Sequence, residues 1–333
     1  MSRAALVLTG VDRFAVEQRE PAEAIGDQVA VEVGLVGLCG TDLHIVDGSH
    51  PRARVPLVLG HELVGHALGG PFAGRAVVVD PLIACGSCSA CQLGQRHVCA
   101  NLRLIGIDRD GGLSGRVVVD PDRLHPIPDG LALTVAALAE PLAVAVHAVR
   151  RAQVAAADKV VIMGAGPIGL LLAHAARRAG AVQILVGEPA PDRRRFAELA
   201  GFETLDPSDP LADLDRRTSG WLADVVFDAA AVPAVAALLP RLVRPAGRIC
   251  LVGTYGRPVE IDLQAVLFRE LSLIGNRVYE PADLDNALAT LAADPPGFAP
   301  LISAVVRLDE APAAFARLRA GEGIKYLVTT GDS

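Results

Sequence analysis

Cysteine, histidine and glutamate side chains occur in the 333-residue sequence at spacings that suit a metal ion. Cys39 and His61 supply a thiolate and an imidazole, two ligand types that Zn²⁺ favours, and the adjacent Glu62 supplies a carboxylate. Glu140 lies in an apolar segment, where a carboxylate is costly unless it coordinates a metal or forms a buried salt bridge. These residues predict a catalytic zinc bound by Cys39, His61 and either Glu62 or Glu140.

The residues after Cys39 offer groups that move protons. Thr41 carries a hydroxyl group and His44 an imidazole, and both can accept and donate a proton. Asp42 could accept a hydrogen bond from the second ring nitrogen of His61 and so orient that ligand. We therefore expect Thr41 and His44 to act in proton transfer beside the zinc.

Four further cysteines form a second cluster, with the spacing C-x2-C-x2-C-x7-C. They are Cys85, Cys88, Cys91 and Cys99. Four thiolates in a short segment that contains glycine fit a closed tetrahedral zinc site, which stabilises structure and binds no substrate. An iron–sulfur cluster is compatible with the same spacing. We expect a structural zinc in a lobe that spans about residues 81–105, and thus two zinc ions per chain.

A glycine-rich motif between an expected strand (158–163) and an expected helix (170–179) indicates a dinucleotide site. The motif consists of Gly164, Gly166, Pro167, Ile168 and Gly169. Its glycines allow a pyrophosphate to approach the backbone at the helix N-terminus. The next expected strand, 183–187, ends at Glu188, whose carboxylate would hydrogen-bond the adenosine ribose.

Glu188 also bears on the choice of cofactor. A carboxylate at this position would repel the additional phosphate of NADP, which favours NAD. Arg193 and the two arginines after it could bind that phosphate instead. The first turn of a solvated helix explains these arginines better, so the sequence favours NAD.

The composition indicates a globular enzyme-sized chain of two domains. Hydrophobic residues make up 51% of the sequence, and the net charge of -7 argues against a nucleic-acid partner. No signal peptide or membrane-spanning segment is apparent, so we expect a cytoplasmic protein with no membrane partner. β-rich segments come first, and strands alternate with helices after residue 155, which predicts an α/β protein with a doubly wound parallel sheet.

The motifs resemble those of the zinc-dependent medium-chain alcohol dehydrogenases over essentially the whole chain. Residues 39–42 match the family's Cys-Gly-Thr/Ser-Asp motif and residues 60–62 its Gly-His-Glu motif. Residues 139–143 resemble the polyol and butanediol dehydrogenase branch. The resemblance implies a homodimer or homotetramer. It also implies a GroES-like catalytic domain over 1–150 and 277–333 and a Rossmann NAD-binding domain over 151–276.

The resemblance implies reversible hydride transfer between NAD(H) and a secondary alcohol, on a polyol, sugar alcohol, amino-sugar alcohol or diol. The resemblance also implies that Thr41 takes the hydroxyl proton and that His44 passes it to water through the ribose of the cofactor. Threonine dehydrogenases share the Cys-Gly-Thr-Asp-Leu-His pattern, so a hydroxy-amino acid is the alternative substrate. A noncatalytic NAD-binding protein with the same fold is an alternative of another class. Zinc-free reductases of the same superfamily lack the four-cysteine lobe and the ligands of the Gly-His-Glu motif, so the sequence argues against that activity.

Overall fold

The computed structural model describes residues 3–331, which divide into two compact units. One unit extends to Glu140 and resumes at Glu280, and the other runs from Pro141 to Tyr279. All predicted metal ligands belong to the first unit, and the glycine motif belongs to the second.

The first unit is built mainly from antiparallel strands. Its larger sheet has the order β10 (Leu124–Pro126), β6 (Ala76–Val79), β5 (Glu62–Ala67), β3 (Val29–Gly37), β18 (Lys325–Thr329) and β17 (Ile302–Arg307), and β9 (Arg116–Val119) also pairs with β3. A smaller sheet has the order β2 (Arg13–Arg19), β1 (Arg3–Gly10) and β4 (Leu57–Val58). β7 (Leu82–Ile83) and β8 (Arg103–Leu104) pair on either side of the four-cysteine segment. The valines at alternate positions of β3, Val29, Val31 and Val33, are buried, so this face of the strand packs against the core.

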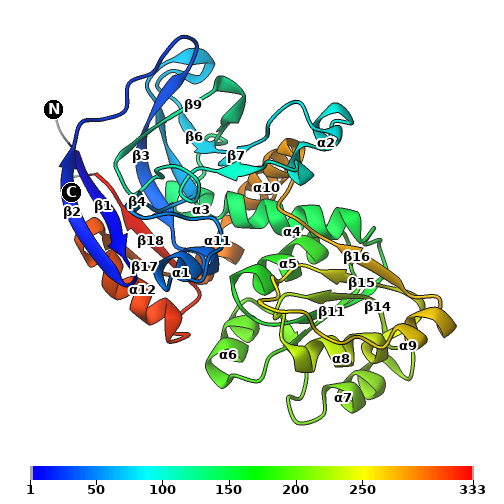
Figure 1. Cartoon of the computed structure of the whole chain (residues 1–333). Helices are drawn as coiled ribbons and strands as arrows, with labels where there is room; N and C mark the ends of the chain where they lie inside the picture. Colours follow the sequence, from blue (N-terminus) through cyan, green and yellow to red (C-terminus); the bar gives the residue numbers. More distant parts are fainter. Residues whose placement is uncertain (1–2, 332–333) are drawn as a thin grey trace. The chain divides into compact units, whose positions relative to one another are not determined.

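The C-terminal strand β18 lies inside the larger sheet, between β3 and the edge strand β17, and its red colour marks it in Figure 1. It pairs antiparallel with β3, with Leu327 opposite Gly37, and Gly37 is in turn opposite Glu62 of β5. Strand β18 comes from the end of the chain, whereas β3 and β5 come from its beginning. Their pairing brings Lys325 and Glu62 close to the end of β3, which Cys39 follows.

Short helices complete the first unit: α1 (Gly40–Val46), α2 (Ser89–Gln92), α3 (Leu133–Ala136), α10 (Pro281–Ala293), α11 (Pro295–Phe298) and α12 (Ala311–Arg319). α1 begins immediately after Cys39, where the Asp42 carboxylate accepts the Cys39 N–H at 2.9 Å. An acid that bonds the N-cap backbone is half of a capping box, and it favours a helix start at this point.

The second unit contains a six-stranded parallel sheet. Its order is β13 (Glu203–Thr204), β12 (Gln183–Gly187), β11 (Lys159–Met163), β14 (Ala223–Asp228), β15 (Val243–Leu251) and β16 (Ser272–Gly275). The helices of this part of the chain are α4 (Ala139–Arg151), α5 (Pro167–Arg178), α6 (Pro191–Leu199), α7 (Pro210–Thr218), α8 (Pro233–Leu242) and α9 (Leu263–Phe268). The strand order reverses between β11 and β14, so the predicted doubly wound sheet is confirmed. Ligands of such sheets bind at the carboxyl ends of the strands next to that reversal.

Within residues 3–331, no helix has both the length and the hydropathy that crossing a membrane requires.

Candidate functional site

Cys39, His61 and Glu62 come together at the N-terminus of α1 and the start of β5. One ligand atom from each lies within 4.8 Å of the other two, close enough to share a metal ion. Gly60 has a φ of +100°, a value that side chains other than glycine rarely adopt, and this turn places His61 and Glu62. A Cβ at Gly37 would come within 2.1 Å of Glu62 Oε2, so only glycine leaves room for this carboxylate.

The ring of His61 is held between an acid and the thiol. Its Nδ1 lies 3.3 Å from Asp42 Oδ1, and both residues are buried. Burial opposes protonation of His61, but Asp42 and Cys39 outweigh it and raise its pKa well above the usual value. Since a metal-bound histidine must be neutral, a metal would replace this proton. Asp42 fixes the orientation of the ring in either state.

Lys325 neutralises Glu62 in the interior. Its Nζ lies 2.8 Å from Glu62 Oε1 and 2.7 Å from Oε2, and it also donates to Leu38 O at 3.0 Å. Lys325 is 2% exposed and Glu62 is fully buried. Burial opposes the charge of Lys325, but Glu62, Cys39 and Glu140 raise its pKa, so the ammonium form is retained.

Sequence reasoning missed Lys325, although a signal was present. A lysine in the apolar run Ile-Lys-Tyr-Leu-Val indicates a buried charge that needs a partner. Its partner could not be identified because β5, which carries Glu62, and β18 are separated by most of the chain.

Glu140 stands at the start of α4 and is 6% exposed. It does not belong to the group formed by Cys39, His61 and Glu62. It is nevertheless close enough for its charge to raise the pKa of Lys325. The structure thus groups Glu62 with the cysteine and the histidine, and places Glu140 beside this group.

Thr41 and His44 lie on α1, next to the grouped ligands. Thr41 Oγ1 is 3.8 Å from Cys39 Sγ. His44 is exposed, and its Nδ1 lies 3.2 Å from Ser49 Oγ, whose hydroxyl also donates to His44 O at 3.3 Å. The structure therefore places a hydroxyl beside the grouped ligands and presents the imidazole of His44 to solvent.

The four cysteines of the second cluster converge in the loop between β7 and β8, and their sulfur atoms all lie within 4.8 Å of one another. Cys88 Sγ is 3.6 Å from Cys91 Sγ and 3.8 Å from Cys99 Sγ. Zn–S bonds of ~2.3 Å in a tetrahedron require sulfur atoms ~3.8 Å apart, so the cluster fits zinc. Hydrogen bonds from Ser87 and Cys88 lower the pKa of Cys85 to about 5, whereas desolvation raises that of Cys91 to about 11.

The glycine motif lines a cavity of about 440 Å³ in the second unit. The motif connects β11 to α5, and Gly166 is the N-cap of that helix. A Cβ at Gly169 would lie 1.9 Å from Gly164 O, which explains why the tight turn needs glycine here. Pro167 and Ile168 occupy the first turn of α5, where proline is favoured. The cavity suits the adenosine half of a dinucleotide.

Glu188 and Arg193 also line this cavity. The Glu188 carboxylate accepts the N–H of Ala165 at 2.9 Å and that of Ala190 at 3.0 Å, so its position is fixed. Arg194 donates to the carbonyl oxygens of residues 188 and 189. Arg193 forms no ion pair within the described residues, and it stands in the first turn of α6, as expected.

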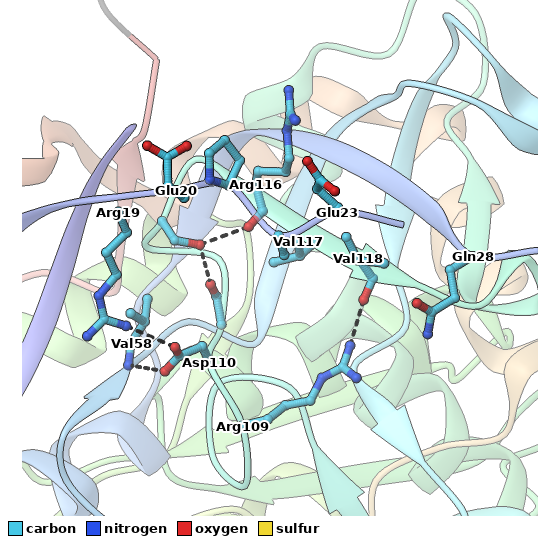
Figure 2. A pocket seen from close by; sticks show the side chains of 14 residues that line it. Arg19, Glu20, Glu23, Gln28, Val58, Arg109, Asp110, Arg116, Val117 and Val118 are labelled. Carbon is cyan, nitrogen blue, oxygen red and sulfur yellow. Dashed lines mark hydrogen bonds and ion pairs between the residues drawn. The ribbon is translucent and has the colours of Figure 1, made fainter. Parts of the chain in front are cut away.

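A separate cavity of about 310 Å³ lies in the first unit, and Figure 2 shows its lining side chains. Asp110 accepts the Val58 N–H at 2.9 Å and an Arg19 N–H at 3.0 Å, and Arg109 donates to Val118 O at 2.7 Å. Acidic and basic side chains both line this cavity, and Arg19 and Asp110 form an ion pair there. None of the predicted site residues lines it. The zinc and nucleotide chemistry therefore belongs to the other sites.

The fold and these clusters together define a zinc-type, nicotinamide-dependent dehydrogenase. Residues 26–129 match the family model described as the alcohol dehydrogenase GroES-like domain, and residues 167–293 match that of the zinc-binding dehydrogenases. The chain is 39% identical to the 2-dehydro-3-deoxy-L-galactonate 5-dehydrogenase of Pseudoalteromonas atlantica, over 90% of this chain and 91% of that protein. It is 31% identical to the sorbitol dehydrogenase of Halalkalibacterium halodurans, over 98% and 99%.

A solved structure leads to the same assignment. The zinc-binding dehydrogenase of Sinorhizobium meliloti bound to NADP superposes with a TM-score of 0.91, at 32% identity and 99% coverage of both chains. The chain belongs to the zinc-type medium-chain alcohol dehydrogenase family, with a GroES-like domain and a Rossmann domain. The expected family, fold class and enzyme class are thereby confirmed.

Proposed function

We propose that the protein oxidises a secondary hydroxyl group of a polyol or a sugar acid to a ketone, and catalyses the reverse reduction, with zinc and NAD(H). The grouping of Cys39, His61 and Glu62 carries this proposal, because it offers three protein ligands and leaves a fourth position for a substrate oxygen. The relatives support the substrate class, since they are named for a deoxygalactonate and for sorbitol.

The two ligand sets support two zinc ions per chain. The catalytic zinc would be held by Cys39, His61 and Glu62, with Glu140 as the alternative carboxylate ligand. The structural zinc would be held by the four cysteines between β7 and β8. When bound, the catalytic zinc would lower the pKa of the substrate hydroxyl as a Lewis acid, and the nicotinamide would accept the hydride.

The protein's own groups would move the proton. Thr41 Oγ1, which lies beside the ligand sulfur, would accept the proton of the substrate hydroxyl and at the same time give up its own hydroxyl proton toward His44. His44 would release that proton to solvent from its exposed ring, which Ser49 Oγ holds through Nδ1. Asp42 would keep His61 in the orientation that its metal-binding nitrogen needs.

A substrate panel tests the proposal. The purified protein would be supplied with zinc and assayed for NADH formation with sorbitol, L-galactonate, 2,3-butanediol and L-threonine. We expect turnover of the polyol or the sugar acid, and threonine turnover would identify the alternative substrate class. A protein that binds NAD but oxidises none of these compounds, and contains one zinc per chain, would be a noncatalytic NAD-binding protein.

Glu188 should set the preference for NAD over NADP. Its fixed carboxylate would accept hydrogen bonds from the ribose and repel a 2′-phosphate. Since a hydrogen bond to a charged group contributes about 1.5–3 kcal/mol, Glu188→Gln should lower the ratio of kcat/KM with NAD to that with NADP by about tenfold or more. Asp192→Asn removes a neighbouring charge outside the cavity and should leave the ratio unchanged. A wild-type preference for NADP would refute this assignment.

We also propose that two copies associate through β16 and α9. β16 is an edge strand of the parallel sheet, and the adjacent α9 exposes 63% of Leu263, 71% of Leu267 and 75% of Phe268. An unpaired edge beside apolar side chains favours pairing with a second copy. Light scattering should give a mass of twice or four times 34.6 kDa, and Phe268→Glu should lower it. Leu199→Glu, on exposed α6, is the matched control, and a monomeric wild type would exclude this association.

A further inference from the structure

The loop of residues 47–56, which joins α1 to β4, is fastened close to the grouped metal ligands. The N–H of His50 donates to His44 O at 2.8 Å, which folds the loop back on the end of α1. The Arg52 guanidinium donates to Leu102 O and lies 3.3 Å from Asp108 Oδ2. The loop is thus held from both sides, and His50 stands between the two attachments.

The ring of His50 has a defined tautomer. Its Nδ1 accepts the N–H of Ala53 at 3.1 Å and that of Arg52 at 3.4 Å, so this hydrogen-bond pattern assigns the proton of the neutral ring to Nε2. Burial and the charge of Arg52 lower the pKa of His50, as do the charges of His44 and His61, against the opposite effect of Asp108. His50 therefore stays neutral, and it lies within electrostatic reach of the ligand His61.

The Nε2–H group of His50 has no hydrogen-bond acceptor among residues 3–331. The same loop carries Arg54, whose guanidinium donates only to the carbonyl oxygens of Pro51 and Ala53 and pairs with no carboxylate of the described chain. The only acid of the loop, Asp47, is used by the N–H of Ser49 at 2.8 Å. The loop thus presents to solvent two donors that no acceptor of the described chain fully occupies, and such donors suit a ligand rich in oxygen acceptors.

We propose that His50 Nε2–H donates a hydrogen bond to a substrate oxygen remote from the reacting carbon, a hydroxyl or a carboxylate, and so selects polyhydroxylated substrates over simple secondary alcohols. This inference rests on the proposed function. His50 is half-buried, so water can bind its Nε2–H when no ligand is present. A substrate oxygen that replaces this water adds a hydrogen bond in the bound state, and an analogue without the oxygen lacks that contribution to binding.

The test compares wild type, His50→Leu and His50→Gln on L-galactonate, galactitol and 2-butanol, with zinc and NAD. We expect His50→Leu to raise KM about tenfold or more for galactonate, galactitol or both, and to change kcat/KM for 2-butanol less than about threefold. His50→Gln retains an N–H donor and should recover part of the loss. A larger loss on galactonate than on galactitol would identify the acceptor as the carboxylate, and equal losses would identify it as a hydroxyl.

The controls separate this proposal from the function on which it rests. His66→Leu replaces an exposed histidine of β5 and should leave all constants unchanged. An unchanged KM in His50→Leu, or an equal loss on 2-butanol, would overturn the role of His50 while the proposed function stands. Absence of turnover by the wild type on all three compounds would overturn both.

Discussion

Replacing Cys39 by serine should lower kcat/KM by at least about 1,000-fold, which corresponds to a barrier higher by about 4 kcal/mol. Serine keeps the size of the side chain, but its hydroxyl is not ionised near neutral pH and is a poor ligand for zinc. The grouped ligands would then be reduced to His61 and Glu62, too few to hold the ion tightly. NADH binding, measured by fluorescence, should change less than about twofold, because the nucleotide cavity contains no residue of this group.

Cys250→Ala is the matched control for this variant. Cys250 is a buried residue of β15 outside both cysteine clusters, and desolvation raises the pKa of its thiol to about 12, as suits an inert core cysteine. Its removal should leave turnover near the wild-type value. If Cys39→Ser kept wild-type turnover, the zinc mechanism would be wrong.

Lys325→Met should destabilise the first unit by about 3–5 kcal/mol, because it leaves Glu62 as an unpaired charge in the interior. Methionine has a similar length, so the loss reports the charge more than the volume. A bound zinc would compensate part of the remaining negative charge of Cys39 and Glu62. The melting temperature of the variant should therefore fall further on addition of EDTA than that of the wild type.

Lys159→Met provides the comparison, since Lys159 and Lys325 are the only lysines of the sequence. The Lys159 ammonium is partly buried and bonds to Thr218 O at 3.4 Å, with no carboxylate partner in the described chain. This variant should melt close to the wild type, with and without EDTA. Equal behaviour of the two variants would show that the buried pair contributes no more to stability than a lysine without a carboxylate partner.

Much of the fold followed from local patterns in the sequence. The run 158–163, the glycine motif and the helix after it are adjacent in sequence, so their strand, turn and helix could be predicted together, and β11 and α5 confirm them. Helix α1 was not expected, because its seven residues show no clear apolar period. Its start depends on the contact between Asp42 and the Cys39 backbone, a local signal that we did not use.

The site was predictable where its residues carry distinctive chemistry. Cysteine and histidine at fixed spacings indicated both metal clusters, and the expected proximity of Asp42 to His61 agrees with the 3.3 Å separation. The pairing of Lys325 with Glu62 depends on the register of β18 with β3, which no local pattern reveals. The tautomer of His50 likewise could not be predicted, because it depends on the backbone N–H groups that the loop directs at Nδ1.

Anomalous diffraction data collected from crystals of the protein on both sides of the zinc absorption edge would locate the metal ions. We expect two zinc peaks per chain. One should lie ~2.3 Å from Cys39 Sγ and ~2.0–2.1 Å from a ring nitrogen of His61, with Glu62 or Glu140 as the third ligand, and the other should lie among the four cysteines between β7 and β8. A single peak among those four cysteines, with none at Cys39 and His61 in zinc-supplemented protein, would contradict the account.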